Sequence, residues 1–527
     1  MRIRPVLCIA LVSALALAGC SKKEQAYSVE EVPLTQITAD LAAGKTTAVA
    51  VTNAYIRRIK AYDGPLHAVI GIAPDALDQA AASDKRRAAG KSLGPLDGVP
   101  ILIKDNIDAV GMPTTAGSYV LIDNLPAKDA EVTRRLRAAS AVILGKTNLS
   151  QWAGWRGTSS FNGSTVGGSP KNPYDLTRTP AGSSSGPGIA AAVSFAAATV
   201  GSETSGSVIG PANVGGLVGM KPTIALISRR GIVPISHTHD IAGPMARSVT
   251  DAAALLNVLA GSDAGDPDSK DADAHKTDYV AALNAASLKG VRLGVVRGVR
   301  GYTPQTQPVF DAALEALKAQ GAELVEIPDD QIEDIGALMR VVLLYDFKQD
   351  VAAYLATTSP DRVKTRTLTD LIAFHTTDAR EKTHSNEVWE ASDATTGFDT
   401  PEYTQTLAEE RRKSREDGID RLLAAYNVSA LVNLSGAPAQ PIPPDGTVNT
   451  TPRPPGAAPP CPCGPQMTLY AAAAGYPHLT VPMGQVDGLP VGLSFIGTAW
   501  SDAQLLSYGY AYEQASHKRV PPPAAKP

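Results

Sequence analysis

Two serine-rich turns and one lysine are the residues of this sequence best suited to nucleophilic catalysis. The first turn reads Gly-Ser-Ser-Ser-Gly over residues 182–186, and the second reads Gly-Ser-Glu-Thr-Ser-Gly-Ser over residues 201–207. An alanine-rich apolar segment, Ile189 to Val200, separates them, which a flexible linker would not contain. A serine hydroxyl attacks a carbonyl carbon effectively only when a base takes its proton. Lys104 is the candidate base, because it follows the apolar run Val99–Ile103, where burial would favour the neutral amine.

Other interpretations of these segments are weaker or purely structural. The pattern around Ser184 matches the G-x-S-x-G nucleophile elbow. An elbow follows an apolar strand, whereas residues 171–180 are polar and contain two prolines. Residues 145–147 read Gly-Lys-Thr, like the end of a P-loop, but Ser140 occupies the position of the loop's first glycine. A structural alternative stays open, in which a serine of residues 183–185 caps a buried helix.

The elements around these residues alternate between short strands and helices. Strands are predicted at Val99–Ile103 and Ala141–Leu144, with a helix over Asp129–Ala139 between them. A second strand–helix–strand alternation covers residues 291–327, and a further helix is predicted from Thr38 to Asp63. This order favours an α/β architecture in which helices cover both faces of a sheet.

The composition is that of an ordinary globular protein. The chain has 527 residues, of which 44% are hydrophobic and 19% charged. Its 48 Lys and Arg against 52 Asp and Glu give a net charge of -4, so no global basic field exists to bind a phosphate backbone. We therefore expect no nucleic-acid partner. Neither composition nor pattern predicts an oligomeric state.

The cysteines and histidines do not indicate a metal site. Cys461 and Cys463 lie within a proline-rich stretch, residues 438–465, in which eleven of 28 residues are proline. No second Cys or His pair at ligand spacing accompanies them, so we expect neither a metal nor another cofactor. His237 and His239 could suggest a Ser–His pair, but a histidine outside a demonstrated site is more often structural.

The order of the motifs resembles the amidase signature family over residues 34–521, and the triple serine together with Glu203 is similar to its peptide amidase branch. The matching segments, in chain order, are 96–106, 145–150, 182–186, 201–207, 231–235, 240–247, 474–477 and 488–493. The resemblance implies an amidase-signature fold, with a large mixed β-sheet core covered on both faces by helices. It also implies that residues 34–527 form a single amidase domain with a proline-rich loop at 438–465.

The resemblance assigns a role to each of the chemically competent residues. The catalytic lysine falls on Lys104, the bridging serine, which follows a cis peptide bond, on Ser183, and the nucleophile on Ser207. Ser184 is an alternative for the bridge, because three consecutive serines leave the alignment open by one position. The turn before the nucleophile offers main-chain N–H groups for an oxyanion hole, namely those of Thr204, Ser205, Gly206 and Ser207. The family's usual Asp-x-Gly-Gly-Ser appears here as Glu-Thr-Ser-Gly-Ser over residues 203–207.

These roles imply a serine amidohydrolase. It would hydrolyse carboxylic amides, C-terminal peptide amides among them, to acid and ammonia through a seryl acyl-enzyme and without a cofactor. Two alternatives stay open. One is a protein that supplies ammonia for misacylated tRNA, as the amidase component of an aminoacyl-tRNA amidotransferase does. The other is a non-catalytic solute-binding lipoprotein on the same fold.

The N-terminus has the pattern of an export signal. Arg2 and Arg4 precede an uncharged apolar run, Val6–Ala18, which is too short for a comfortable membrane span. The run ends in Leu-Ala-Gly-Cys at Cys20, which resembles the bacterial lipoprotein box. We expect residues 1–19 to be a signal peptide, Cys20 to carry lipid, and residues 20–33 to be a tether. The protein would then be anchored on the periplasmic face of a membrane, the outer membrane in preference to the inner.

Overall fold

The computed structural model describes most of the chain after the first 26 residues. The described residues are 27–156, 159–160, 163–381, 385–442, 448–449 and 467–523. The predicted signal peptide, Cys20, Cys461 and Cys463 lie outside them, as does most of the proline-rich stretch.

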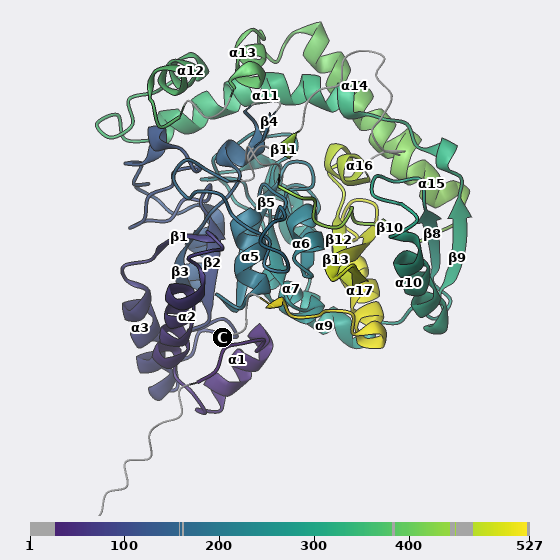
Figure 1. The fold of residues 1–527 in the computed structure, drawn as a ribbon, viewed down its shortest axis with the longest axis horizontal. Coiled ribbons are helices and arrows are strands. Elements are labelled where there is room, and N and C mark those ends of the chain that lie inside the picture. The colour runs from purple at the N-terminus through teal and green to yellow at the C-terminus, as the bar shows by residue number, and fades with distance from the viewer. Residues whose placement is uncertain are drawn as a thin grey trace, which may run out of the picture.

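An 11-stranded mixed sheet forms the centre of the molecule (Figure 1). Its strands, in spatial order, are β1 (Val69–Ile72), β3 (Val142–Thr147), β2 (Pro100–Lys104), β5 (Ala198–Glu203), β7 (Ile241–Ala246), β6 (Val218–Lys221), β12 (His478–Val486), β13 (Leu489–Ile496), β10 (Ala430–Leu434), β8 (Arg292–Val296) and β9 (Glu323–Ile327). Strand β2 runs parallel to both β3 and β5, whereas β5 and β7 are antiparallel. A separate two-stranded ladder joins β4 (Ser159–Ser160) to β11 (Val448–Asn449).

Helices bury the central strands completely. Every residue of β2, β3, β5 and β7 is buried. Successive side chains of a strand point to opposite faces of a sheet, so both faces must be covered. The predicted fold, a mixed sheet with helices on both faces, is therefore confirmed.

The helices differ in what they cover. Residues 34–320 and the C-terminal part provide α1 (Leu34–Ala42), α2 (Ala48–Tyr62), α3 (Ala76–Ala88), α4 (Glu131–Ala138), α5 (Ser185–Ala192), α6 (Ile209–Val214), α7 (Val249–Leu259), α8 (Ala272–His275), α9 (Tyr279–Ala282), α10 (Gln307–Ala319), α16 (Met467–Ala474) and α17 (Asp502–Ser516). A second group, α11 (Gly336–Thr357), α12 (Leu368–Thr377), α13 (Glu387–Asp393), α14 (Pro401–Ser414) and α15 (Asp420–Ala425), arches over one end of the sheet (Figure 1). None of the helices in the described ranges has the length and apolar character needed to cross a bilayer.

Two predicted segments differ from the structure. The single helix expected over residues 38–63 is instead two helices, α1 and α2. They are separated by a turn in which Gly44 has a φ of 67° and Thr47 caps α2 through its hydroxyl. The apolar segment 189–200 contains the end of α5 and the start of β5. Short apolar runs do not distinguish a buried helix from a buried strand, which explains why this division was not predicted.

Candidate active site

Lys104 is the last residue of β2, and its neighbours in the sheet decide what it contacts. Strands β2 and β5 are parallel, with Ile103 opposite Val200. The carboxyl end of β2 therefore lies beside the end of β5, where Ser202 is located. The Lys104 Nζ is 2.9 Å from the Ser202 Oγ and 3.2 Å from the Ser202 main-chain oxygen.

Lys104 also contacts the serine loop, from which it is 79 residues distant in sequence. Its Nζ donates a hydrogen bond of 2.8 Å to the Ser183 Oγ. The lysine side chain is completely buried. Burial lowers the pKa of Lys104 from 10.5 to about 7, and the carboxylates of Asp240 and Glu203 offset this effect only in part. A large fraction of the amine is therefore neutral near pH 7 and able to accept a proton.

The structure distinguishes the two candidate bridging serines. Ser183 follows a cis peptide bond from Gly182 and contacts Lys104, as described above. The Ser184 Oγ instead donates to the main-chain oxygen of Ser202 at 3.0 Å and accepts from the Ser202 N–H at 3.2 Å. A Cβ on Gly201 would approach the Ser184 Oγ to 2.8 Å, so glycine is needed there for this contact. Ser184 thus joins the serine loop to β5, and Ser183 is the serine that meets the lysine.

The turn that carries Ser207 connects β5 to α6. The Glu203 Oε2 closes this turn by accepting hydrogen bonds from the N–H groups of Val208 at 2.7 Å and Ile209 at 3.0 Å. Gly206 has a φ of 89°, a conformation that favours glycine. The N–H groups of residues 204–207 make no hydrogen bond within the part of the chain that the structure describes. They are therefore free to serve as oxyanion donors.

The serine loop and the nucleophile turn lie side by side, but their two hydroxyls are not hydrogen-bonded. The Ser184 N–H donates to the main-chain oxygen of Ser207 at 3.1 Å. Among the described residues, the Ser207 hydroxyl has no hydrogen-bond partner, whereas the Ser183 hydroxyl accepts from Lys104. One of the two contacts in the predicted lysine–serine–serine series is thus formed. Catalytic hydrogen bonds are often longer in a free enzyme and shorten when substrate binds.

Asp240 supports the same turn from the opposite strand. Its carboxylate accepts from the Thr204 hydroxyl at 2.5 Å and from the N–H groups of Ile235 and Ser236 at 2.7 and 2.9 Å. These donors stabilise the ionised form, although burial raises the pKa of this carboxyl. The contact fixes the first residue of the turn against β7.

Comparisons with known proteins agree with this geometry. The sequence profile of the amidase family matches residues 50–506, which is most of the chain. This protein belongs to the amidase family. Enzymes of this family are hydrolases that act on amide C–N bonds, and the chain is one of them.

Several relatives match the amidase over nearly its whole length. The crystal structure of the peptide amidase from Stenotrophomonas maltophilia is 41% identical, with a TM-score of 0.84, and the match covers 93% of this chain and 98% of that one. A probable amidase from Arabidopsis thaliana is 33% identical over 98% of this chain and 96% of its own length. The A component of the glutamyl-tRNA(Gln) amidotransferase from Chloroflexus aurantiacus is 34% identical over 92% and 97%, respectively.

Two residues that contact this site in the amidase were not predicted. Ser202 accepts from Lys104, and Asn106 donates to the Ser202 Oγ at 2.9 Å through its Nδ2. A sequence signal for Asn106 exists, because it lies two residues after Lys104 and side chains alternate along an extended segment. No comparable signal exists for Ser202, which meets the lysine only through the pairing of β2 with β5.

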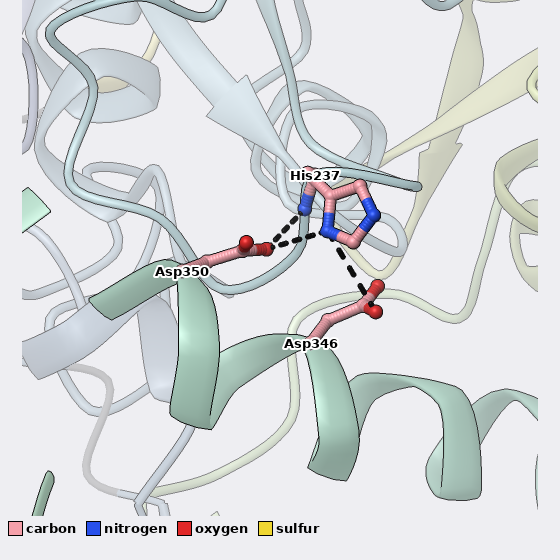
Figure 2. A group of neighbouring side chains, drawn as sticks. All are labelled: His237, Asp346 and Asp350. Atoms are coloured by element: carbon pink, nitrogen blue, oxygen red, sulfur yellow. Dashed lines mark hydrogen bonds and ion pairs between the residues drawn. The ribbon is translucent and has the colours of Figure 1, made fainter. Parts of the chain in front are cut away.

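The two histidines considered in the sequence take part in polar contacts between the 229–240 loop and the α11–α14 helices. The His237 Nδ1 is 2.9 Å from the Asp350 Oδ2 and 3.8 Å from Asp346, both on α11 (Figure 2). The His239 Nε2 is 2.9 Å from the Glu410 Oε1. Neither ring hydrogen-bonds to Ser207 within the described ranges, so a Ser–His pair is not formed.

His237, Asp346 and Asp350 could in principle hold a metal ion, since their ligand atoms lie within 4.8 Å of one another. However, Asp346 already accepts hydrogen bonds from the hydroxyls of Ser236, Thr238 and Tyr403. Asp350 accepts from both the main-chain N–H and the ring of His237. These contacts satisfy the group without an ion, and we interpret it as a structural link.

A cavity of about 880 Å³ lies on the α11 side of the same loop. Its lining includes Pro234, His237, Asp240, Asp350 and Tyr354. Lys104, Ser183 and Ser207 are not among its lining residues, and Asp240 is its link to the nucleophile turn. The cavity is therefore adjacent to the candidate active site but separate from it.

Proposed function

We propose that this amidase is a serine amidohydrolase that cleaves carboxylic amides, C-terminal peptide amides among them, to the free acid and ammonia. The observation that carries the proposal is the 2.8 Å contact between the Ser183 hydroxyl and a fully buried Lys104. The identity of 41% with a peptide amidase supports the substrate class.

In this mechanism Lys104 acts as a base through Ser183. The Ser207 Oγ attacks the carbonyl carbon and passes its proton to the Ser183 Oγ, whose own proton moves to the Lys104 Nζ. The C–N bond then breaks while Ser183 gives a proton to the leaving nitrogen and regains one from the lysine ammonium. Water hydrolyses the Ser207 ester by the same route, and the carboxylic acid leaves.

The nucleophile turn would stabilise the negative charge that develops on the carbonyl oxygen. The N–H groups of residues 204–207 are unpaired among the described residues. Preorganised donors of this kind account for about 3 to 4 kcal/mol of transition-state stabilisation each. Asp240 and Glu203 would hold the turn in the conformation that presents them.

Substrate specificity is tested by the release of ammonia from a panel of amides. We expect C-terminal peptide amides to give kcat/KM values about tenfold or more above those of short aliphatic amides, because a larger acyl part makes more contacts in the transition state. Anilides and free glutamine complete the panel.

The same panel distinguishes the alternatives. A preference for glutamine would instead favour a function like that of the amidotransferase component, which matches this chain at 34% identity. Absence of turnover on every amide, together with no labelling of Ser207 by a fluorophosphonate, would favour a solute-binding lipoprotein. We favour the amidohydrolase, because the net charge of -4 offers no basic field for a tRNA and the N-terminus has the pattern of an export signal.

We also propose that lipid on Cys20 anchors the protein to the periplasmic face of a bacterial membrane, the outer membrane in preference to the inner. Support comes from the sequence pattern of residues 1–20. We expect Cys20→Ala to move the protein from the membrane fraction to the periplasmic extract. Cys8→Ala, in the apolar run of the signal, is the matched control and should leave the distribution unchanged. A Cys20→Ala protein that stays wholly in the membrane fraction would contradict this proposal.

A further inference from the structure

We propose that Asn106 is a positioning residue that directs the lone pair of neutral Lys104 towards Ser183. The inference rests on the proposed function, in which Lys104 accepts a proton through Ser183. It concerns why the amine accepts that proton from Ser183 and not from the other serine beside it.

The Lys104 Nζ has three oxygen neighbours. These are the Ser183 Oγ at 2.8 Å, the Ser202 Oγ at 2.9 Å and the Ser202 main-chain oxygen at 3.2 Å. An ammonium group has three hydrogens and can donate to all three. A neutral amine has two hydrogens and one lone pair, so one of its neighbours must donate to it. The main-chain oxygen has no hydrogen to give, which leaves the two hydroxyls of Ser183 and Ser202 as possible donors.

Asn106 decides between these two hydroxyls. A serine hydroxyl has one hydrogen and two acceptor positions. The Ser202 Oγ accepts from the Lys104 Nζ and from the Asn106 Nδ2, both at 2.9 Å, so its acceptor positions are filled by these two donors. Its hydrogen must then point away from both nitrogens. The lone pair of the neutral amine is thereby left for the hydroxyl of Ser183.

The orientation of the Asn106 amide is itself determined by its surroundings. Its Nδ2 also faces the main-chain oxygen of Val233 at 3.5 Å, and the Asn106 main-chain oxygen accepts from the Val233 N–H at 2.8 Å. A flipped amide would place its own oxygen against the Val233 oxygen. The Asn106 Oδ1 is buried without a partner among the described residues, a cost that the structure accepts in this orientation.

Loss of the Asn106 amide would free one acceptor position on Ser202. The Ser202 hydroxyl could then rotate and donate to Lys104, in competition with Ser183. The fraction of enzyme in which Lys104 can receive a proton from Ser183 would fall. This effect requires the Ser202 hydroxyl, and it lowers the rate of the chemical step more than the binding of substrate.

A double-mutant cycle between Asn106→Ala and Ser202→Ala tests this dependence. The readouts are kcat and KM on a peptide amide and, separately, the rate at which a fluorophosphonate labels Ser207. In the wild-type background we expect Asn106→Ala to lower kcat and the labelling rate about tenfold or more, with KM changed by less than about twofold. In the Ser202→Ala background the same substitution should lower either rate by less than about threefold.

Asn124→Ala is the matched control, because Asn124 is another buried asparagine whose Nδ2 donates two hydrogen bonds, to the Thr114 oxygen and the Tyr354 hydroxyl, each at 3.0 Å. It should leave both rates within about twofold of wild type. Equal losses from Asn106→Ala in both backgrounds would overturn the proposal and leave the amidohydrolase function intact. A wild-type protein that labels at Ser207 but cleaves no amide would reject the proposed function, while the labelling rates would still test Asn106. A protein whose Ser207 is not labelled at all would overturn both.

Discussion

Replacement of Ser207 by alanine is expected to lower kcat at least about 10⁴-fold while leaving the fold intact. The expectation follows from the position of Ser207 at the end of a turn whose N–H groups are unpaired among the described residues. Without the Oγ, no acyl-enzyme can form, and only water activated by the remaining groups could attack the amide. Ammonia release at saturating substrate measures the effect.

Two further measurements support this test. A fluorophosphonate should label the wild-type protein at Ser207 and should not label the variant. Ser501→Ala is the control, because Ser501 makes an ordinary hydrogen bond to the Thr498 oxygen at the start of α17, at the surface. Its kcat should stay within about twofold of wild type. Turnover retained by purified Ser207→Ala protein would exclude Ser207 as the nucleophile.

Replacement of Lys104 by methionine is expected to lower kcat about 10³-fold or more at pH 7 to 8, because no other neutral amine contacts Ser183 among the described residues. In the wild type, activity should also fall as the pH drops below the pKa of Lys104, which burial has lowered to about 7. The sign follows from the mechanism, since the protonated lysine cannot accept the proton of Ser183. A plot of kcat/KM against pH should therefore have an acid limb with an apparent pKa near 7. A rate that is constant down to pH 5 would contradict this role.

The same pKa shift predicts how stability depends on pH. Between about pH 7 and pH 10 the lysine is neutral in the folded protein and protonated in the unfolded chain, whose pKa is near 10.5. The unfolded state then binds one more proton, so the free energy of unfolding rises with pH by about 1.4 kcal/mol per pH unit from this group.

Lys104→Met removes that contribution and isolates it. Urea unfolding of both proteins at pH 7, 8 and 9 should show that the wild type gains stability relative to Lys104→Met as the pH rises. Other titrating groups are common to both proteins and cancel in the difference. A difference that does not change with pH would show that Lys104 has an ordinary pKa and is not the proposed base.

Much of the framework could be predicted from residue patterns. The strand that ends in Lys104, the β8–α10–β9 alternation and the helices over both faces follow from hydrophobic periodicity, which burial in the sheet enforces. The break between α1 and α2 and the division of residues 189–200 could not be predicted in this way. In both places, turn geometry and tertiary packing outweigh a continuous apolar pattern.

The amino-acid sequence by itself determined which residue types are available for chemistry and in what order, because the lysine strand and the two serine turns are local motifs. Only the tertiary structure decided which serine meets Lys104, since a shift of one position in the serine loop exchanges a contact with the amine for one with the backbone of β5. It also placed Ser202 and Asn106 together, because these residues are 96 positions apart and meet through the packing of β2 beside β5. The lowered pKa of Lys104 depends on the same packing, because an isolated strand would leave the amine in water and charged.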